Sequence, residues 1–202
     1  MKISIIMPTY NDSSTIIDTI DSVANQSYSN WQLIIMNDGS TDNVEDVIKQ
    51  YRDNSVHKEK IEYYSQKNQD QLNAIRNCID YIKGEFVYIL HSDDLLPDDN
   101  LFMRLVEEAK ANPDTKVFIG DLITIDENNN ITGKLEVLKY AKDKKMLPTL
   151  MLWLGRNLYV LFDADVGGGG SGSGNRQSGD EQGSGNGTGQ GLGHGHFLLV
   201  FQ

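Results

Sequence analysis

Cysteine and positive charge are both scarce in this chain of 202 residues. Its one cysteine, Cys78, cannot form an internal disulfide, so a reducing cytoplasm is the expected compartment. Lysine and arginine number 18 against 29 aspartates and glutamates, which gives a formal net charge of -11. Nucleic-acid phosphates require basic side chains, so this balance argues against a nucleic-acid partner.

Long apolar runs and the familiar phosphate-binding signatures are also missing. No stretch of 18 apolar residues occurs, so we expect no transmembrane helix, and Pro8 interrupts the amino terminus too early for a signal peptide. Neither G-x-G-x-x-G after the first strand nor G-x-x-x-x-G-K-[ST] occurs, which argues against dinucleotide dehydrogenases and P-loop enzymes. No nucleophile elbow G-x-S-x-G follows a predicted strand.

The most informative stretch is a buried strand that ends on two carboxylates. Residues 86–90 are a continuous run of aromatic and branched apolar residues, which predicts a strand in the middle of a parallel sheet. His91, Ser92, Asp93 and Asp94 follow, where open α/β sheets bind their ligands. Adjacent ionised carboxylates repel, so we expect a divalent cation there. For an isolated Asp-Asp pair, capping of the next helix is the alternative.

The first part of the chain alternates between strand and helix patterns. Strands are predicted at residues 3–7, 31–36, 61–64, 86–90 and 117–119, with residues 122–125 pairing nearby in a hairpin around 128–130. Helices are predicted after a cap at Ser13 or Ser14, over 44–51, over 72–82 with Gly84 closing the helix, and over 98–111. This alternation predicts an α/β fold, a mostly parallel sheet with helices on both faces.

The last third of the chain has a different composition. The apolar stretch 146–154 lacks clean periodicity, so three interpretations are open: a core helix, a partner surface or a membrane-interface patch. We favour the interpretation that it belongs to the core. Residues 167–196 hold most of the 19 glycines and are predicted to be a flexible coil. His194 and His196 are candidate metal ligands, although tail residues are the favoured interpretation. The apolar residues 197–202 have no evident packing partner.

Three predicted strand ends, at 8–11, 37–42 and 91–94, should meet at one edge of the sheet, each followed by a helix amino terminus. An acidic rim with helix dipoles suits a metal-bridged diphosphate. Without a metal, a carboxylate about 4 Å from a phosphate charge would cost roughly 4 kcal/mol at an effective dielectric of 20. Gly39 permits a tight turn, and Asp38 can accept N–H donors from a flat heterocycle; an ordinary capped turn is the alternative.

Taken together and in this order, these stretches resemble the GT-A glycosyltransferases of family 2, which use nucleotide-diphosphate sugars. The resemblance covers residues 1 to about 125 and includes M-P-T-Y-N at 7–11, N-D-G-S-T-D at 37–42 and S-D-D at 92–94. It implies that Asp38 binds the base, commonly uracil, and that Asp93 and Asp94 hold Mn²⁺ or Mg²⁺. The nucleotide-binding residues that the resemblance implies are Pro8, Thr9, Tyr10, Asn11, Asp38, Gly39, Arg76, Ser92 and Asp93.

The chain departs from the family pattern near the third helix. Residues 65–70 read S-Q-K-N-Q-D where many members have S-E-K-D-K-G, and Arg76 and Cys78 replace a familiar Asn and Gly. His91 stands where the first aspartate of D-S-D-D is often found. These departures leave the base and sugar preference open. Arg76 either pairs with a phosphate or lies on a solvated helix face.

The acceptor side departs further. An inverting member needs a general base, usually a carboxylate in the acceptor half, and here that region is the glycine tract. We therefore assign no base; the candidates are Asp163, Asp165, Asp180 and Glu181. The chain divides into a nucleotide-sugar-binding core (1–125), a partial acceptor-side region (126–166) and a flexible tail (167–202).

Two functions follow from the resemblance. The first is a glycosyltransferase that moves a sugar from a nucleotide-diphosphate donor, a UDP-sugar in the favoured version, to a saccharide or lipid-linked acceptor in cell-surface polysaccharide synthesis. Such a protein would be cytoplasmic, with peripheral contact to the cytoplasmic side of the membrane as a variant. The alternative is a catalytically impaired nucleotide-sugar and metal-binding domain that lacks the acceptor half.

Overall fold

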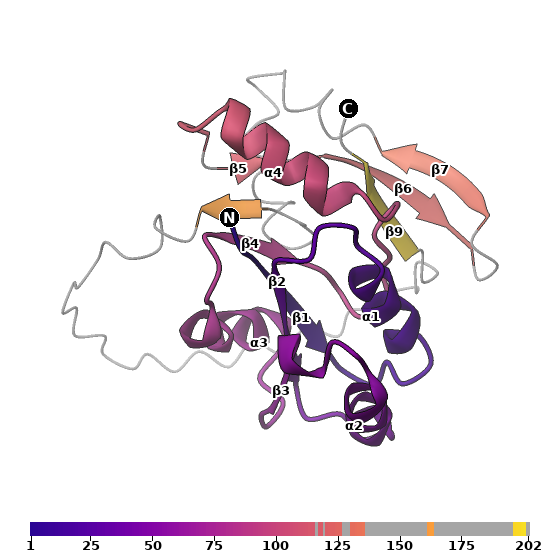
Figure 1. Ribbon diagram of the computed structural model, residues 1–202. Coiled ribbons are helices and arrows are strands. Elements are labelled where there is room, and N and C mark those ends of the chain that lie inside the picture. Colours follow the sequence, from indigo (N-terminus) through magenta and orange to yellow (C-terminus); the bar gives the residue numbers. More distant parts are fainter. Residues whose placement is uncertain (116, 119, 127–129, 136–160, 164–195, 201–202) are drawn as a thin grey trace, which may run out of the picture.

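The computed structural model describes residues 1–115, 117–118, 120–126, 130–135, 161–163 and 196–200. Its main sheet has six strands in the order β3-β2-β1-β4-β8-β5 (Figure 1). The first four pair in parallel, whereas β8 runs antiparallel to both β4 and β5. The predicted mostly parallel sheet is therefore confirmed. The strands are β1 (Ile3–Thr9), β2 (Trp31–Asn37), β3 (Ile61–Ser65), β4 (Phe86–Ile89), β5 (Val117–Phe118) and β8 (Leu161–Asp163).

Helices cover both faces of this sheet, as the sequence predicts. Alternate side chains of a strand point to opposite faces, so β1 sends Ile5 to one core and Ile6 to another. The larger core packs β1 and β2 against α1, α2 and α4, and the smaller core packs them against α3. The helices are α1 (Ile16–Ala24), α2 (Val44–Asn54), α3 (Gln71–Asn77) and α4 (Leu101–Ala111), with short 3₁₀ helices η1 (Lys58–Lys60) and η2 (Ile79–Tyr81).

Two helices begin later than predicted. Helix α1 starts at Ile16 after Thr15, whose side chain makes no capping hydrogen bond, so neither Ser13 nor Ser14 is the cap. Helix α4 starts at Leu101 instead of near residue 98. The backbone N–H of Phe102, in the first turn of α4, has no partner within the helix and donates to Gln26 Oε1 at 3.0 Å. The side chain of Gln26, just after α1, therefore caps a helix that is distant in sequence.

The third predicted helix is shorter than its apolar spacing indicates. Helix α3 ends at Asn77, and after Cys78 the chain tightens into η2. Gly84 does not close this helix. Instead its N–H donates to Ser4 Oγ at 2.9 Å, and a Cβ there would lie 2.5 Å from the Lys2 carbonyl oxygen. The absence of a side chain at Gly84 therefore lets the segment before β4 pack directly on β1.

A second, antiparallel sheet has the order β7-β6-β9. The predicted hairpin is confirmed, because β6 (Asp121–Ile125) pairs with β7 (Ile131–Leu135). The expectation for the last apolar residues was wrong, because β9 (His196–Val200) pairs with β6 along its length. The stretches 146–154 and 167–195 lie outside the described residues, as does most of the predicted acceptor-side region. No helix among the described residues has the length and apolar character needed to cross a bilayer.

Candidate functional site

A cavity of about 330 Å³ opens at the carboxyl edge of the main sheet. Strands β2, β1 and β4 are parallel neighbours, so their carboxyl ends lie side by side and bring three loops together. This is the edge at which open α/β sheets bind ligands. The cavity is lined by Pro8, Thr9, Tyr10, Asp12, Asp38, Asn68, Asp70, Gln71, His91, Ser92 and Asp93.

Asp12 ties the loop after β1 to the loop after β4. Its Oδ2 accepts hydrogen bonds from Thr9 Oγ1 at 3.2 Å, from the Tyr10 N–H at 3.0 Å and from Ser92 Oγ. A carboxylate with three donors is strongly held, because bonds to a charged acceptor are stronger than neutral ones. Asp12 therefore fixes the position of Ser92, and with it the start of the acidic pair.

The loop after β4 is also fixed by the start of α1. The Ser92 carbonyl oxygen accepts from Thr15 Oγ1 at 3.1 Å and from Thr19 Oγ1 at 3.0 Å, and Ser92 Oγ, whose one proton is shared with Asp12, also lies 3.1 Å from the Pro8 carbonyl oxygen. Ser92 is buried, so these bonds are shielded from competing water. The polypeptide on either side of Ser92 is consequently held between β1 and α1.

Asn11 joins the loops after β1 and β2. It has φ 62°, a left-handed conformation that asparagine tolerates better than most residues. Its Oδ1 accepts from the Thr41 N–H at 2.7 Å and the Asp42 N–H at 3.3 Å, just before α2. Asp42 Oδ2 in turn accepts from the Ser13 N–H at 2.9 Å. Burial would raise the pKa of Asp42, but this bond and others lower it overall.

Asp38 is held at the cavity wall by the loop that follows β3. Asp38 as a whole is only 3% exposed, and its Oδ1 accepts from Gln66 Nε2 at 2.7 Å and the Gln69 N–H at 2.9 Å. Gly39 follows with φ +72°, and a Cβ there would lie 2.7 Å from the Asn68 backbone nitrogen. Glycine is therefore required at this turn for both conformation and space.

The acidic pair is divided between the cavity and the protein interior. Asp93 is half-buried and lines the cavity, whereas Asp94 is 2% exposed and is absent from the cavity wall. Burial and the nearby charge of Asp94 raise the pKa of the buried Tyr88 hydroxyl. Burial lowers the pKa of His91, partly offset by Asp93 and Asp12, and Gln71 contacts the His91 ring.

The carboxylates of Asp12, Asp70 and Asp93 lie along the lining of the cavity. Among the described residues no group of three histidine, cysteine, aspartate or glutamate side chains forms a ready metal site. Mg²⁺ and Mn²⁺ prefer oxygen ligands, and Mg²⁺ is usually held by one or two carboxylates plus waters and substrate phosphates. Asp93, with Asp12 and Asp70 on the same wall, presents that chemistry.

The structure brings most of the predicted nucleotide residues together. Pro8, Thr9, Tyr10, Asp38, Ser92 and Asp93 line the cavity. Asn11 and Gly39 shape its loops through the backbone geometry described above, without lining it. Sequence reasoning missed Asp12, Asn68, Asp70 and Gln71 as lining residues; the nearest signal was the unusual stretch 65–70.

The remaining candidates lie elsewhere or outside the described residues. Asp163 is in β8, where only its backbone is described, and the same holds for His196 at the start of β9. Asp165, Asp180, Glu181 and His194 lie outside the described residues. Arg76 lines a different pocket, of about 580 Å³, beside α3 and the end of β3.

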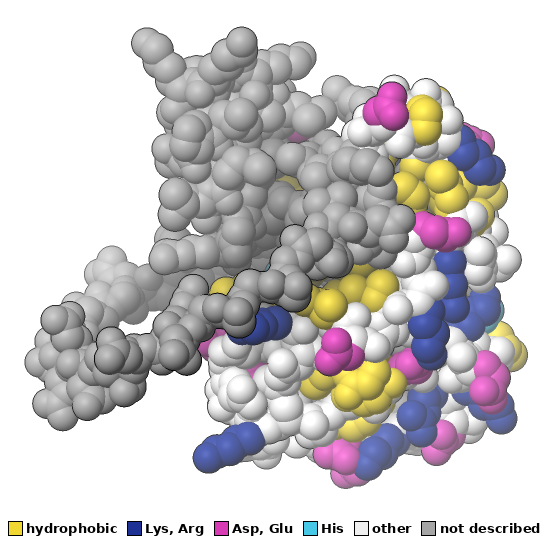
Figure 2. Space-filling view, turned by 90° about the vertical axis from the view of Figure 1, so that its left-hand side faces the viewer, with side chains coloured by type: hydrophobic (Ala, Val, Ile, Leu, Met, Phe, Trp, Pro, Cys, Tyr) yellow, Lys and Arg dark blue, Asp and Glu magenta, His cyan; other side chains and the backbone are white. Residues whose placement is uncertain are grey.

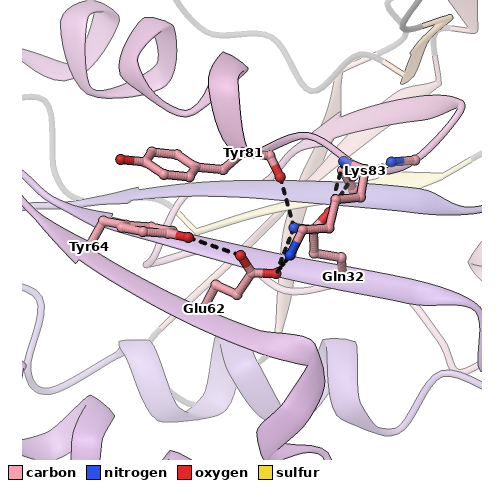
Figure 3. Close-up of polar contacts among 7 residues, drawn as sticks. Gln32, Glu62, Tyr64, Tyr81 and Lys83 are labelled. Atoms are coloured by element: carbon pink, nitrogen blue, oxygen red, sulfur yellow. Dashed lines mark hydrogen bonds and ion pairs between the residues drawn. The ribbon is translucent and has the colours of Figure 1, made fainter.

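A network of polar contacts holds the strand side of this second pocket (Figure 3). Glu62 accepts from Tyr64 Oη at 2.9 Å, Gln32 Nε2 at 2.8 Å and Lys83 Nζ at 2.7 Å. The Tyr64 ring stacks on the Tyr81 ring with centroids 3.8 Å apart, and the Tyr81 carbonyl accepts from Gln32. Burial and the Glu62 charge raise the pKa of Tyr64 to about 12. The network thereby fixes η2 against the edge of the sheet.

The outer surface of this region is mixed in character. Figure 2 views the side of the molecule that lies on the left in Figure 1, where hydrophobic side chains lie among acidic and basic ones. The second pocket itself carries one residue of each sign, Arg76 and Asp80.

Comparison with known proteins places the chain among glycosyltransferases. The sequence model of the family described as "Glycosyl transferase family 2" matches residues 4–167. The poly-beta-1,6-N-acetyl-D-glucosamine synthase of Staphylococcus epidermidis is 32% identical over 139 residues, which are 69% of this chain and 32% of that protein. The UDP-Glc:alpha-D-GlcNAc-diphosphoundecaprenol beta-1,3-glucosyltransferase WfgD of Escherichia coli is 33% identical over 145 residues, 72% of this chain and 54% of WfgD.

Solved structures share the fold. Staphylococcus aureus TarS 1-349 in complex with UDP-GlcNAc matches with a TM-score of 0.53 and 22% identity, over 59% of this chain and 34% of TarS. The mannosyltransferase PcManGT from Pyrobaculum calidifontis, in complex with GDP-Man and Mn²⁺, matches with a TM-score of 0.55 and 20% identity, over 59% of this chain and 35% of that chain. The chain spans about a third of most of these proteins and about half of WfgD.

Proposed function

Because this chain belongs to glycosyl transferase family 2, we propose that it binds a nucleotide-diphosphate sugar in the cavity at the carboxyl edge of the main sheet. The observation that carries the proposal is the convergence of Asp38 and Asp93 on one cavity whose loops are tied by Asp12. Asp38 would receive the base, and the backbone of Pro8, Thr9 and Tyr10 would lie along the nucleoside.

We propose a UDP-sugar as the donor. TarS was solved with UDP-GlcNAc and WfgD is named for a UDP-glucose donor, so two proteins similar to this chain support the uridine nucleotide. PcManGT was solved with GDP-Man, so the base needs its own test. The acceptor would be a saccharide or a lipid-linked sugar in cell-surface polysaccharide synthesis, as the names of the poly-N-acetylglucosamine synthase and WfgD suggest.

Asp93 would hold Mn²⁺ or Mg²⁺ against the diphosphate, with Asp94 as the second predicted ligand. When bound, the cation supplies positive charge for the departing nucleoside diphosphate. The residues of the chain itself position the donor: Ser92 is locked between Asp12 and α1, so Asp93 is presented at a fixed place. Fixed placement of this kind contributes to rate by avoiding reorganisation during the reaction.

Transfer with inversion would require a base that takes the proton of the acceptor hydroxyl. Asp163, Asp165, Asp180 and Glu181 remain the predicted candidates for it. We also propose a cytoplasmic location, with contact to the membrane where the acceptor is lipid-linked.

Calorimetric titration with UDP, with and without MnCl₂, tests the donor site. We expect Mn²⁺ to tighten UDP binding, and Asp93→Asn to lower the affinity in Mn²⁺ by about tenfold or more, toward the metal-free value. Asp53→Asn on α2 removes the same charge from a side chain that is 72% exposed, and should leave binding unchanged. UDP binding that does not respond to metal, or to Asp93→Asn, would count against the cation site.

Release of UDP from UDP-sugars, with and without saccharide acceptors, tests the transfer step. Acceptor-dependent release over many turnovers would support the full glycosyltransferase function. Tight UDP-sugar binding without acceptor-dependent release would favour the alternative, a donor-binding domain with impaired transfer.

A further inference from the structure

The two oxygens of the Asp38 carboxylate have different surroundings. Oδ1 accepts from Gln66 Nε2 and from the Gln69 N–H, at 2.7 and 2.9 Å, so it already carries one donor for each of its two lone pairs. No hydrogen bond to Oδ2 occurs from any residue that the structure describes. Because Asp38 lines the cavity, Oδ2 is the oxygen that can accept from a ligand.

Asp38 sets which end of the Gln66 amide faces it, and Asn77 contacts the other end. The Asn77 amide Nδ2 donates to Gln66 Oε1 at 2.8 Å. The Asp38 carboxylate can only accept, so the Gln66 amide turns its Nε2 toward Asp38 and leaves Oε1 to accept from Asn77. The Gln66 backbone N–H also donates to the Asn37 carbonyl oxygen at 2.9 Å, at the end of β2. Asn77, Gln66 and Asp38 are thus linked by two consecutive side-chain hydrogen bonds, and we call this arrangement the relay.

We propose that this relay makes Gln66 a specificity-determining residue for the base, an inference that rests on the proposed nucleotide site. A carboxylate with one available oxygen suits a base that offers one ring N–H between two carbonyl groups, as uracil does. Guanine offers N1–H and a 2-amino group side by side, and needs both carboxylate oxygens. With Oδ1 already occupied, the 2-amino group would be left without an acceptor, which costs binding free energy.

The experiment compares UDP, GDP and IDP by calorimetry in MnCl₂. Guanine and the hypoxanthine of IDP have the same ring system and the same N1–H and differ in the 2-amino group, so the GDP-to-IDP affinity ratio isolates the second donor. In Gln66→Leu one lone pair of Oδ1 becomes available. We expect the ratio to rise about tenfold, the worth of one hydrogen bond to a charged acceptor, and UDP affinity to fall about fivefold because Asp38 is less well oriented.

Two further variants sharpen the test. Asn77→Ala removes the side chain that donates to Gln66 Oε1 and restrains Gln66, and it should shift both quantities in the same direction by a smaller factor. Gln50→Leu makes the same chemical change on the exposed surface of α2 and should shift neither.

If the GDP-to-IDP affinity ratio is the same in Gln66→Leu and in the unmodified chain, the proposed role of the relay in base specificity is wrong. If neither purine nucleotide binds, UDP decides: an unchanged UDP affinity in Gln66→Leu overturns the relay, and a loss confined to Gln66→Leu and Asn77→Ala supports it. Failure of the unmodified chain to bind UDP at all would instead refute the proposed function.

Discussion

Replacing Asp12 with alanine tests whether this carboxylate holds together the loops that line the cavity. The change removes the acceptor for Thr9 Oγ1, the Tyr10 N–H and Ser92 Oγ. Hydrogen bonds to a charged group contribute about 1.5 to 3 kcal/mol each. The two hydroxyls can rotate, and Ser92 Oγ already has the Pro8 carbonyl as a second acceptor, so part of that energy is recovered. We expect the free energy of unfolding to fall by about 2 kcal/mol.

Urea denaturation of Asp12→Ala, beside Asp18→Ala, measures this loss. Asp18 is an exposed acidic residue in the first turn of α1, so its removal changes net charge equally and should cost no more than about 0.5 kcal/mol. Because Asp12 fixes Ser92 next to Asp93, UDP affinity in Mn²⁺ should also fall in Asp12→Ala and stay constant in Asp18→Ala. Equal stability of the two variants, within about 0.5 kcal/mol, would refute the role given to Asp12.

Two further predictions concern the sheet. Gly84→Ala should lower the free energy of unfolding by about 2 to 3 kcal/mol, because the new Cβ would lie 2.5 Å from the Lys2 carbonyl oxygen and 2.8 Å from the Ser4 nitrogen. In Gly133→Ala the new Cβ would contact only the Thr124 hydroxyl, at 2.9 Å, so the same denaturation assay should show a loss of less than about 1 kcal/mol. Burial alone would raise the pKa of Glu62, but hydrogen bonds from Lys83, Tyr64 and Gln32 lower it below 4.5. The difference in the free energy of unfolding between the unmodified chain and Glu62→Gln should therefore be largest above pH 4.5 and shrink as pH falls through the lowered pKa. A difference that grows on acidification would contradict this prediction.

The main strands could be predicted because their signal is local. The runs at residues 3–7, 31–36 and 86–90 are apolar almost throughout, and the structure buries β1 and β2 completely. Parallel pairing then places the strand ends at one edge, so the meeting of Pro8, Asp38 and Asp93 followed from topology. No side-chain geometry was needed for that step.

What could not be predicted depends on partners distant in sequence. Nothing near Asp12 indicates that it meets Ser92, and nothing near Leu101 indicates that Gln26 caps its helix. The third helix shows a different failure. Leu72 and Ile79 fit a helical apolar stripe, yet they are 67% and 57% exposed, so their spacing does not report burial. Contacts of Tyr81 with Gln32 and Tyr64 instead favour the tighter η2 turn.

Strand β8 has a consequence for the order in which the chain acquires its structure during synthesis. It fills the position between β4 and β5, although residues 161–163 leave the ribosome long after β4. Strands β1 to β4, and with them the three loops around the cavity, can therefore assemble first. Until β8 arrives, the outer edge of β4 presents unpaired backbone groups beside the apolar Phe86 and Val87, the kind of edge that pairs with other chains. The loops that line the cavity and the strand that covers the edge of β4 thus lie in different segments, which are completed at different times.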